Sequence, residues 1–261
     1  MELTVITVTA FIASAITLFS GFGLGTVLMP AFALFFPIPV AIAATAIVHL
    51  TNNLFKLGLL GRQADWQIVL RFALPAAVAA ILGAGVLLFF AEMPILTRYE
   101  LFGRGHEVTA LKLVIGALII GFALAELSPA FSSLTVPRKY VAWGGLLSGF
   151  FGGLSGNQGA FRSAFLVTAV DTKEAFVATG VVCAVIVDIT RLAVYGLSYV
   201  RENIGALPSN ITGLVLSAML AAFAGAYFAK RLLKKVTYRT IRVFVSAAMI
   251  FIGAGLAAGA I

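Results

Sequence analysis

Charged side chains that stand inside long apolar stretches are the first candidates for chemistry in this chain. Arg162, Asp188 and Arg191 each lie in such a stretch, and a charge at the centre of a bilayer costs about 2.5–3.5 kcal/mol on insertion scales. Asp188 and Arg191 are three residues apart, which is compatible with a structural ion pair on one helix face. Arg162 has no carboxylate at helical spacing close to it in the sequence, and this indicates a substrate-binding role.

A second group of polar residues follows one helical stripe. His49, Asn52, Asn53 and Lys56 have the spacing i, i+3, i+4 and i+7, so all four occupy the same side of a helix. Such a stripe must avoid lipid. Two interpretations stay open: Lys56 extends to a nearby interface while the asparagines join neighbouring helices, or the stripe lines a polar binding site.

The two groups together predict an anion site. If Asp188 is neutralised by Arg191, then Arg162 and Lys56 leave an electropositive cavity suited to a small anion. His49 and Asp188 are the deeply placed groups able to carry a coupling proton. His49 is equally compatible with an ordinary, hydrogen-bonded interior histidine.

Composition indicates the elements that position these residues. Residues of the hydrophobic set make up 61% of the 261 and charged residues only 11%, whereas a soluble domain carries about a quarter charged residues. Long uncharged runs predict an all-α integral membrane protein in the lipid bilayer, with about eight transmembrane helices near 4–35, 38–60, 67–91, 108–127, 139–170, 173–198, 207–229 and 241–260. Between them, 92–107 mixes charged and apolar residues and is predicted to be a loop, with a surface helix as the alternative.

The first and fifth of these helices are predicted to be broken at glycine-rich turns. The run from Leu3 to Phe36 holds no charge, and as one helix it would reach about 50 Å, well beyond a bilayer core. The expected break is Gly21-Phe22-Gly23-Leu24-Gly25, and its counterpart is the stretch 149–159. Close helix packing is the alternative reason for such glycines. Kinks and re-entrant hairpins both remain open. The candidate substrate-binding residues are Arg162, Asn157, Gln158, Lys56, Asn52, Asn53, Arg191, Gly23, Gly25, Gly156 and Gly159.

The chain divides into two similar halves. We expect a first four-helix repeat over 1–127, a connecting loop over 128–138 and a second four-helix repeat over 139–261. A gapless offset of 134 matches five identical residues in corresponding helices, namely Gly25, Ala41, Ala44, Thr45 and Val48 with Gly159, Ala175, Ala178, Thr179 and Val182. Transporters often consist of two repeats, inverted or parallel, that meet at a central site.

Basic residues predict the orientation, because Lys- and Arg-rich loops stay cytoplasmic. With eight crossings, ten basic residues fall on one side and five on the other, which places both termini outside the cytoplasm. The net charge of +8 is spread along short loops, so nucleic acid is not an expected partner. Cys183 is the single cysteine and there are two histidines, so neither a metal site nor another cofactor is expected. A homodimer is compatible with the sequence. The amino-terminal residues lack a secretory signal, so the first apolar segment is expected to be retained.

Two glycine-rich stretches and one helix carry a family resemblance. They are Gly21-Phe22-Gly23-Leu24-Gly25-Thr26-Val27-Leu28-Met29-Pro30, residues 41–50, and Gly144-Gly145-Leu146-Leu147-Ser148-Gly149-Phe150-Phe151-Gly152-Gly153. With them the sequence resembles the sulfite exporter TauE/SafE family of bacterial membrane proteins, over nearly the whole chain. The resemblance implies a duplicated helical bundle in the bacterial inner membrane. It also implies ion-gradient-driven export of sulfite or organosulfur anions.

The second glycine-rich turn departs from the family pattern. Asn157, Gln158 and Arg162 interrupt it, and Ala164 stands where the first half has Pro30. This favours a different or larger anion than sulfite, such as a sulfonate.

Two other functions remain as alternatives. One is an anion channel or a structural membrane protein. The other is an intramembrane serine protease, because Gly153-Leu154-Ser155-Gly156 matches a short rhomboid-like signature. Such proteases take their base from a histidine downstream of the serine, whereas both histidines here, His49 and His106, lie upstream. The sequence therefore predicts a transporter and not an enzyme.

Overall fold

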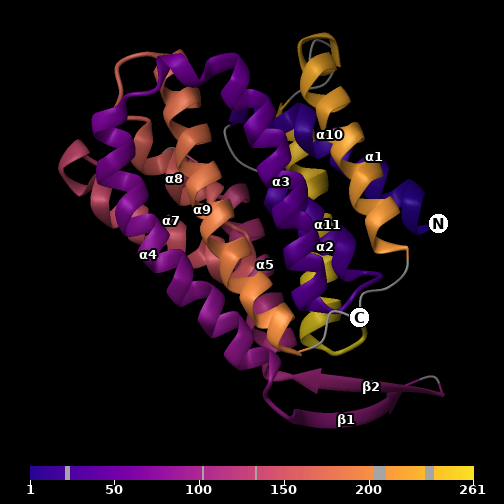
Figure 1. Ribbon diagram of the computed structural model, residues 1–261. Coiled ribbons are helices and arrows are strands. Elements are labelled where there is room, and N and C mark those ends of the chain that lie inside the picture. Colours follow the sequence, from indigo (N-terminus) through magenta and orange to yellow (C-terminus); the bar gives the residue numbers. More distant parts are fainter. Residues whose placement is uncertain (21–23, 102, 133, 203–209, 233–237) are drawn as a thin grey trace.

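The computed structural model describes residues 1–20, 24–101, 103–132, 134–202, 210–232 and 238–261. Helices dominate this part of the chain (Figure 1), and two strands, β1 (Ile95–Leu101) and β2 (Arg104–Thr109), form one hairpin. The helices are α1 (Glu2–Ser20), α2 (Leu24–Ala33), α3 (Ile38–Leu60), α4 (Trp66–Ala91), α5 (Ala110–Leu127), α6 (Pro129–Ser132), α7 (Val141–Ser155), α8 (Gly159–Leu166), α9 (Lys173–Glu202), α10 (Ile211–Leu232) and α11 (Tyr238–Ala257). Two 3-10 turns, η1 (Gly61–Gln63) and η2 (Arg138–Tyr140), precede α4 and α7.

Several of these helices have the length and apolar character of membrane spans. In the described ranges they are α3, α4, α5, α9 and α10, and shorter apolar helices accompany them. Large apolar side chains face outward on α4, where Leu74, Val78 and Leu82 are each at least 60% exposed. Such a surface suits lipid and not water. The prediction of an all-α integral membrane protein is therefore confirmed, and the unbroken helices lie within four residues of their predicted ranges.

Local side-chain signals fix where the helices begin. The Asp65 carboxylate accepts hydrogen bonds from the backbone N–H groups of Gln67 and Ile68, which caps α4. The Thr109 hydroxyl caps α5 in the same way through the N–H of Lys112. Pro37 directly precedes α3, where a missing N–H costs nothing. These signals define the first residues of α3, α4 and α5.

The stretch between α4 and α5 is a β-hairpin, so both predictions for 92–107, a loop and a surface helix, are wrong. Cross-strand pairs hold the two strands together: Arg98 forms an ion pair with Glu107 at 3.0 Å, and the rings of Tyr99 and His106 stack at 5.1 Å. Gly103 adopts a left-handed φ of 72° in the turn. The Tyr99 hydroxyl also donates to the carbonyl of Ala258. The hairpin is thereby attached to the residues that follow α11.

The helices α7 and α8 form a helical hairpin and not a kinked crossing. Gly156 ends α7 with a left-handed φ of 82°, and its N–H donates to the carbonyl of Gly152. The chain then reverses, because near the end of α8 the carbonyl of Ala164 accepts a hydrogen bond from the N–H of Val136, which precedes α7. Gly144, in the first turn of α7, lies directly against the ring of Phe165. The two ends of this hairpin therefore lie together.

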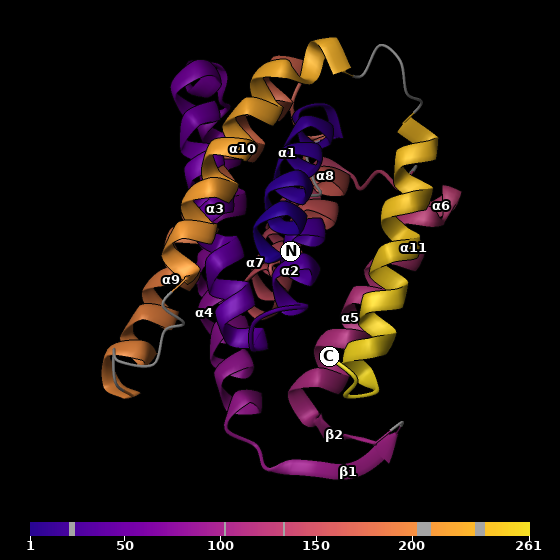
Figure 2. The same cartoon turned by 90° about the vertical axis from the view of Figure 1, so that its right-hand side faces the viewer.

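The helices α1 and α2 form a second hairpin. The helix α1 ends at Ser20 and α2 begins at Leu24, as the predicted break requires, while Gly21, Phe22 and Gly23 lie outside the described residues. Residues spread along both helices line one groove together with α11, among them Val5 and Ile12 of α1 and Val27 and Ala31 of α2. The two helices therefore lie side by side (Figure 2).

The two hairpins enter the bundle from opposite ends. The α1–α2 hairpin leads directly into the start of α3. The α7–α8 hairpin leads into the start of α9, which lies beside the far end of α3, since the N–H of Asp65 donates to the hydroxyl of Thr179 at 2.9 Å. Figure 1 shows the same arrangement, with α3 and α9 running in opposite directions at the centre. Both hairpin tips consequently lie in the middle of the bundle.

Glycines allow the outer arm of each hairpin to touch a long helix. Gly145, Gly149 and Gly153 face the carbonyl oxygens of Phe72, Ala76 and Ala80 in α4, where a methyl group would lie 2.2, 2.0 and 2.2 Å from those oxygens. The helices α1 and α10 pack similarly, because a methyl group at Gly225 would lie 2.2 Å from the carbonyl oxygen of Phe11. Close packing is thus the role of these glycines, whereas Gly156 ends a helix.

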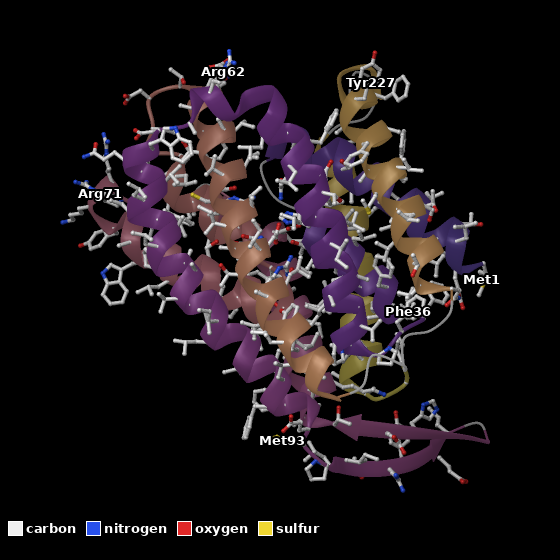
Figure 3. All side chains as sticks on the ribbon, in the orientation of Figure 1. Met1, Phe36, Arg62, Arg71, Met93 and Tyr227 are labelled. Atoms are coloured by element: carbon white, nitrogen blue, oxygen red, sulfur yellow. The ribbon has the colours of Figure 1, made fainter. Side chains whose placement is uncertain are left out.

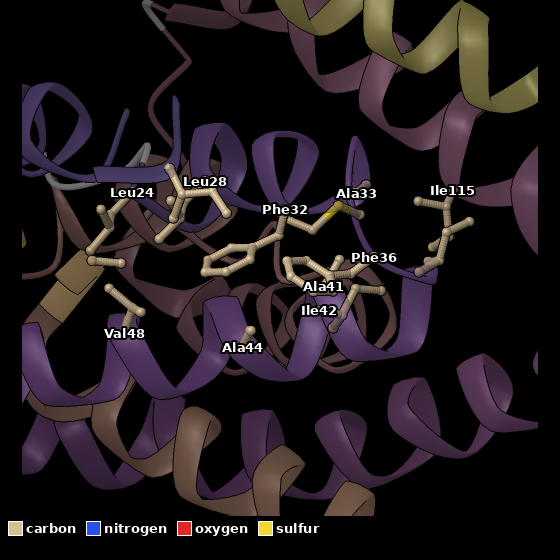
Figure 4. Packing of buried hydrophobic residues seen from close by; sticks show 14 of the residues in the cluster. Leu24, Leu28, Phe32, Ala33, Phe36, Ala41, Ile42, Ala44, Val48 and Ile115 are labelled. Carbon is tan, nitrogen blue, oxygen red and sulfur yellow. The ribbon is translucent and has the colours of Figure 1, made fainter. Parts of the chain in front are cut away.

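Helix packing relates the two halves of the chain. The pair α4 and α7 has its counterpart in α10 and α1, while α3 packs on α9 and α5 packs on α11. Exchanging the halves therefore turns the first two pairs into each other and maps α3–α9 and α5–α11 each onto itself. The largest apolar cluster lies between α2, α3 and their neighbours (Figure 4), with Leu24, Leu28, Phe32, Phe36 and Ile42 in contact. A second cluster joins α4, α7, α8 and α9.

Candidate functional site

The tips of the two hairpins face each other at the centre of the bundle. A methyl group added at Gly25, at the start of α2, would lie 3.0 Å from the carbonyl oxygen of Gly156, at the end of α7. It would also lie 3.9 Å from the ring of His49 in α3. Gly25, Gly156 and the polar stripe of α3 therefore meet at one place. Figure 3 shows nitrogen and oxygen atoms in the interior between α3 and α9.

The α3 stripe faces inward, as its spacing predicts. His49, Asn52, Asn53 and Lys56 are all buried. Asn53 contacts His49, with its amide nitrogen 3.1 Å from Nδ1 and 3.3 Å from Nε2. Asn52 accepts a hydrogen bond from the hydroxyl of Ser14 in α1, at 3.3 Å. The stripe thus joins α3 to the first hairpin as well as to the interior.

Asp188 is the centre of a hydrogen-bonded cluster. One carboxylate oxygen lies 2.6 Å from Nδ1 of His49. The other accepts from Nε and Nη2 of Arg191, at 3.1 and 2.8 Å, and from Nε2 of Gln158, at 2.9 Å. Removing one partner of a buried ion pair destabilises a protein strongly, because the other charge stays buried without a counter-ion. These contacts therefore give the Asp188–Arg191 pair a structural role.

Arg191 also binds the end of the second hairpin. Its Nη1 donates to the carbonyl of Gly152 at 3.1 Å, and the hydroxyl of Tyr195 donates to the carbonyl of Gly153. Both carbonyls belong to the last turn of α7, where a cation is favourable because helix dipoles place partial negative charge there. Arg191 does not line the cavity described next. Its position is that of a residue that holds the hairpin tip.

A small cavity of about 30 Å³ lies beside this cluster. Three of the predicted residues on α3 and one on α8 meet in it. By volume it accommodates two or three water-sized groups, since one water needs about 10–15 Å³. It is lined by Leu24 of α2, His49, Asn53 and Lys56 of α3, Arg162, Ser163 and Leu166 of α8, and Phe176, Val177, Gly180 and Val181 of α9.

Lys56 is the most informative residue of the cavity wall. It is 6% exposed, so it does not extend to the surface, and the interpretation in which Lys56 reaches a nearby interface is excluded. Within the described ranges its ammonium group makes neither a hydrogen bond nor an ion pair. Arg162, also buried, lies on the same cavity. A buried ammonium group without a counter-ion is costly, and an anion in the cavity would remove that cost.

The remaining predicted residues are near the cavity but not on its wall. Asn157 donates to the hydroxyl of Ser155 at 3.2 Å, and Gln158 binds Asp188. Gly156 and Gly159 form the tip between α7 and α8, while Gly23 lies outside the described residues. Among described atoms, Asn52 Nδ2, Asn157 Oδ1 and Gln158 Oε1 are buried without a hydrogen-bond partner.

Sequence reasoning missed three residues that hold the site together. Ser14 binds Asn52, and Ser148 donates to the backbone carbonyl of Gln158 at 2.8 Å. The third, Tyr195, lies one helical turn after Arg191. This spacing places both side chains on the same face of α9 and could have been recognised in the sequence. The two serines are related by the same offset of 134 that relates the halves.

The contacts of Ser155 differ from those of a catalytic serine. Its hydroxyl donates to the carbonyl of Phe151 at 3.1 Å and accepts from Asn157. In the part of the chain that the structure describes, no histidine nitrogen is hydrogen-bonded to it. Ser155 thus lacks a base that would activate it.

Comparison with known protein families gives a clear result. The family model described as sulfite exporter TauE/SafE matches residues 6–256, which is nearly the whole chain. The chain belongs to the TauE/SafE family. A search of the curated proteins found no match. Family membership and the apolar helices together make this TauE/SafE protein a multi-pass membrane protein with a transport role.

Proposed function

We propose that this protein is a secondary transporter that exports a small sulfur-containing anion, sulfite or an organosulfonate, across the bacterial cytoplasmic membrane. The observation that carries the proposal is the buried Lys56 ammonium group, which shares a cavity with Arg162 and lacks a partner among the described residues. Two cations on one small cavity favour an anion there. The family match supports the sulfur chemistry.

The hairpin tips add to the attraction for an anion. The helix α2 begins at Leu24, which lines the cavity, and α8 begins at Gly159, three residues before Arg162. Free N–H groups at helix starts carry partial positive charge and face anionic substrates in transporters with broken helices. Asn157 and Gln158, at the second tip, complete the proposed polar surroundings.

We further propose that residues 1–127 and 139–261 are inverted repeats joined by 128–138. Support comes from the helix pairs that exchange with the halves, and from hairpins that enter from opposite ends. In such folds, rocking of one half against the other exposes a central site alternately to the two sides. The His49–Asp188 contact at the interface of the halves is the proposed coupling site for protons.

The proposed orientation has both termini in the periplasm. Each hairpin begins and ends at the same end of the bundle, so it does not count as a crossing. The basic residues are therefore divided between the two ends more unevenly than the ten and five that eight crossings predict. The end that includes Arg62 and Tyr227 (Figure 3) receives nine basic residues of the described ranges, namely Arg62, Arg71, Arg138, Lys139, Lys173, Lys230, Arg231, Arg239 and Arg242. The end that includes Met93 receives four, namely Arg98, Arg104, Lys112 and Arg201. A reporter active only in the cytoplasm, fused after Ile261, should be inactive; activity there would reverse the orientation.

Anion flux tests the transport proposal. Purified protein in liposomes should accumulate sulfite or a sulfonate only when a proton gradient is imposed. Arg162→Ala should abolish this flux without reducing the amount of inserted protein. The matched control is Arg98→Ala, which removes the same charge from the exposed β-hairpin and should leave flux intact. Equal flux from the Arg162→Ala variant and wild type would contradict the proposed site.

The same vesicles test the coupling proposal and separate a carrier from a channel. His49→Gln should keep exchange of labelled anion between the two sides but lose accumulation driven by the proton gradient. Unchanged accumulation in this variant would remove His49 from the coupling mechanism. Wild-type flux that never exceeds the equilibrium distribution would indicate a channel.

A further inference from the structure

We infer that the corner of the bundle where α4 and α7 begin binds an anionic phospholipid of the surrounding membrane. Arg71 and Lys139 bind the phosphate group of this lipid, and the apolar outer face of α4 receives its acyl chains. Neither residue lines the central cavity, so the lipid site does not depend on which anion is transported.

The beginnings of α4 and α7 lie side by side in a fixed register. The side chains of Asp65 and Arg138, which directly precede the two helices or their first turns, approach to 3.9 Å. Further along, the helix backbones touch where Phe72, Ala76 and Ala80 of α4 face Gly145, Gly149 and Gly153 of α7. The residue numbers differ by 73 in every pair, so the two helices run in the same direction. Residues from both halves of the chain therefore form one surface at this corner.

The exposed charges of this corner leave a positive surplus. Arg138 faces the carboxylate of Asp65. Arg71 and Lys139 are both exposed, and in the described part of the chain neither of them forms an ion pair. Two more carboxylates at this end of the bundle, Asp171 and Glu174, lie where α9 begins. Two cations thus remain without a carboxylate partner, which suits a phosphate group.

Aromatic side chains place this corner at the level of the lipid head groups. The chain has two tryptophans, and both lie here: Trp66 begins α4 and Trp143 lies in the first turn of α7, with 59% and 63% of their surface exposed. Tyr140 directly precedes α7, and its ring centroid lies 4.9 Å from Nζ of Lys139. Tryptophan and tyrosine are enriched where the membrane meets water. The two cations therefore lie at the depth of the lipid phosphates.

The outer face of α4 continues from this corner as an apolar strip. Leu70, Leu74 and Val78 follow one another at helical spacing, and each is more than half exposed. Arg71 lies next to Leu70 near the start of this strip, and Figure 3 shows it directed away from the bundle. With 26 residues, α4 is about 39 Å long and exceeds the hydrocarbon core of a bilayer. The long side chain of Arg71 therefore reaches the phosphate level while the leucines face acyl chains.

These features fit an anionic phospholipid better than a zwitterionic one. Phosphatidylglycerol, as the representative anionic lipid, carries one net negative charge. In phosphatidylcholine the quaternary amine cancels the phosphate charge and would be repelled by Arg71 and Lys139. Each Lys or Arg near a membrane surface contributes about a fivefold preference for anionic lipid. A free phosphate lacks the chains that would cover the exposed strip of α4.

Quenching of tryptophan fluorescence tests this inference, because both tryptophans of the chain lie at the proposed site. The full-length protein is reconstituted in phosphatidylcholine bilayers. A rising fraction of the lipid is then replaced by phosphatidylglycerol with brominated acyl chains or, in a parallel series, by brominated phosphatidylcholine. Bromine quenches a tryptophan that lies next to it. Wild type should bind phosphatidylglycerol at least about fivefold more tightly than phosphatidylcholine.

Arg71→Gln and Lys139→Gln test the two cations. Each substitution should lower the preference, and the double variant should bind the two lipids within about twofold of each other. Both side chains are exposed, so the packing of α4 on α7 should be unchanged. The matched control is Arg98→Gln, which removes an exposed arginine from the β-hairpin at the other end of the bundle (Figure 1) and should keep the wild-type preference.

Three outcomes would overturn the inference. The first is equal quenching of wild type by the two brominated lipids, a comparison that needs no variant to fold. The second is a double variant that keeps the full preference for phosphatidylglycerol. The third is displacement of brominated phosphatidylglycerol by millimolar glycerol phosphate, which carries the phosphate without acyl chains and would indicate a site for free phosphate.

Discussion

The two helical hairpins share a framework but differ in the chemistry at their tips. The α1–α2 tip is built from glycine and apolar residues, with Leu24 and Gly25 at its second arm. The α7–α8 tip presents Asn157, Gln158 and, one turn later, Arg162. In the first half the polar residues stand instead on the unbroken helix α3. The helix packing of the two halves thus corresponds, whereas the proposed binding groups are distributed unequally between the halves.

This difference has a physical reason. Close contact of two helix backbones permits only glycine at the crossing points, so both halves must keep glycine there. A charged side chain, in contrast, needs to reach the cavity from one half only. Lys56 reaches the cavity from α3 and Arg162 reaches it from α8, so the two cations come from different halves of the chain. In the proposed rocking mechanism, an anion bound between them would connect the two halves that move relative to each other.

The largest expected effect tests the shared framework. Gly149→Leu should abolish folding, since the first added carbon would lie 2.0 Å from the Ala76 carbonyl oxygen and the helix backbone cannot yield. Gly225→Leu, at the α1–α10 contact, should also abolish folding. The fraction of monodisperse protein after detergent extraction measures this. The control is Gly85→Leu, because Gly85 has open space around it. A Gly225→Leu protein that folds normally while Gly149→Leu does not would show that the two contacts are not equivalent.

A smaller effect tests the cluster that belongs to the second half. Asp188→Leu should lower the free energy of unfolding by about 3–5 kcal/mol, because it leaves the Arg191 guanidinium buried without its counter-ion. The double variant Asp188→Leu/Arg191→Leu should recover most of that loss, since two apolar residues need no pairing. Chemical denaturation in detergent measures both variants. Additive losses in the double variant would mean that the two side chains do not act as a pair.

The smallest effect compares two serines related by the offset of 134. Ser148→Ala removes the hydrogen bond to the Gln158 carbonyl, and Ser14→Ala removes the bond to Asn52. Each should cost about 1 kcal/mol of stability. Transport should separate them: Ser148→Ala loosens the tip that leads to Arg162, so its apparent affinity for anion should fall further. Equal affinities in the two variants would weaken the idea that the second tip is the more important for binding.

Much of the fold and part of the site are readable from the sequence. Helix positions follow from uncharged runs, and the break after Ser155 follows from the glycines around Gly156. The inward stripe of His49, Asn52, Asn53 and Lys56 follows from helical spacing alone. Each of these depends on local pattern, which a single sequence contains.

Other features depend on contacts between distant segments. Nothing local distinguishes a kink from a hairpin, because the reversal after Gly156 is visible only where Ala164 meets Val136. Arg191 binds a carbonyl at the end of α7, and this contact is predictable only if the end of α7 is known to lie beside α9. The β-hairpin was missed because its pairing of Arg98 with Glu107 joins two stretches whose mixed composition also suits a loop.

The central claim is that the hairpin tips and α3 enclose one anion site between the halves. A crystal structure with bound selenite, a heavier analogue of sulfite, tests it most directly through the anomalous scattering of selenium. We predict a single strong peak in the cavity between Lys56 and Arg162. A well-occupied peak elsewhere, with this cavity dry and closed by side chains while the protein still transports, would contradict the account.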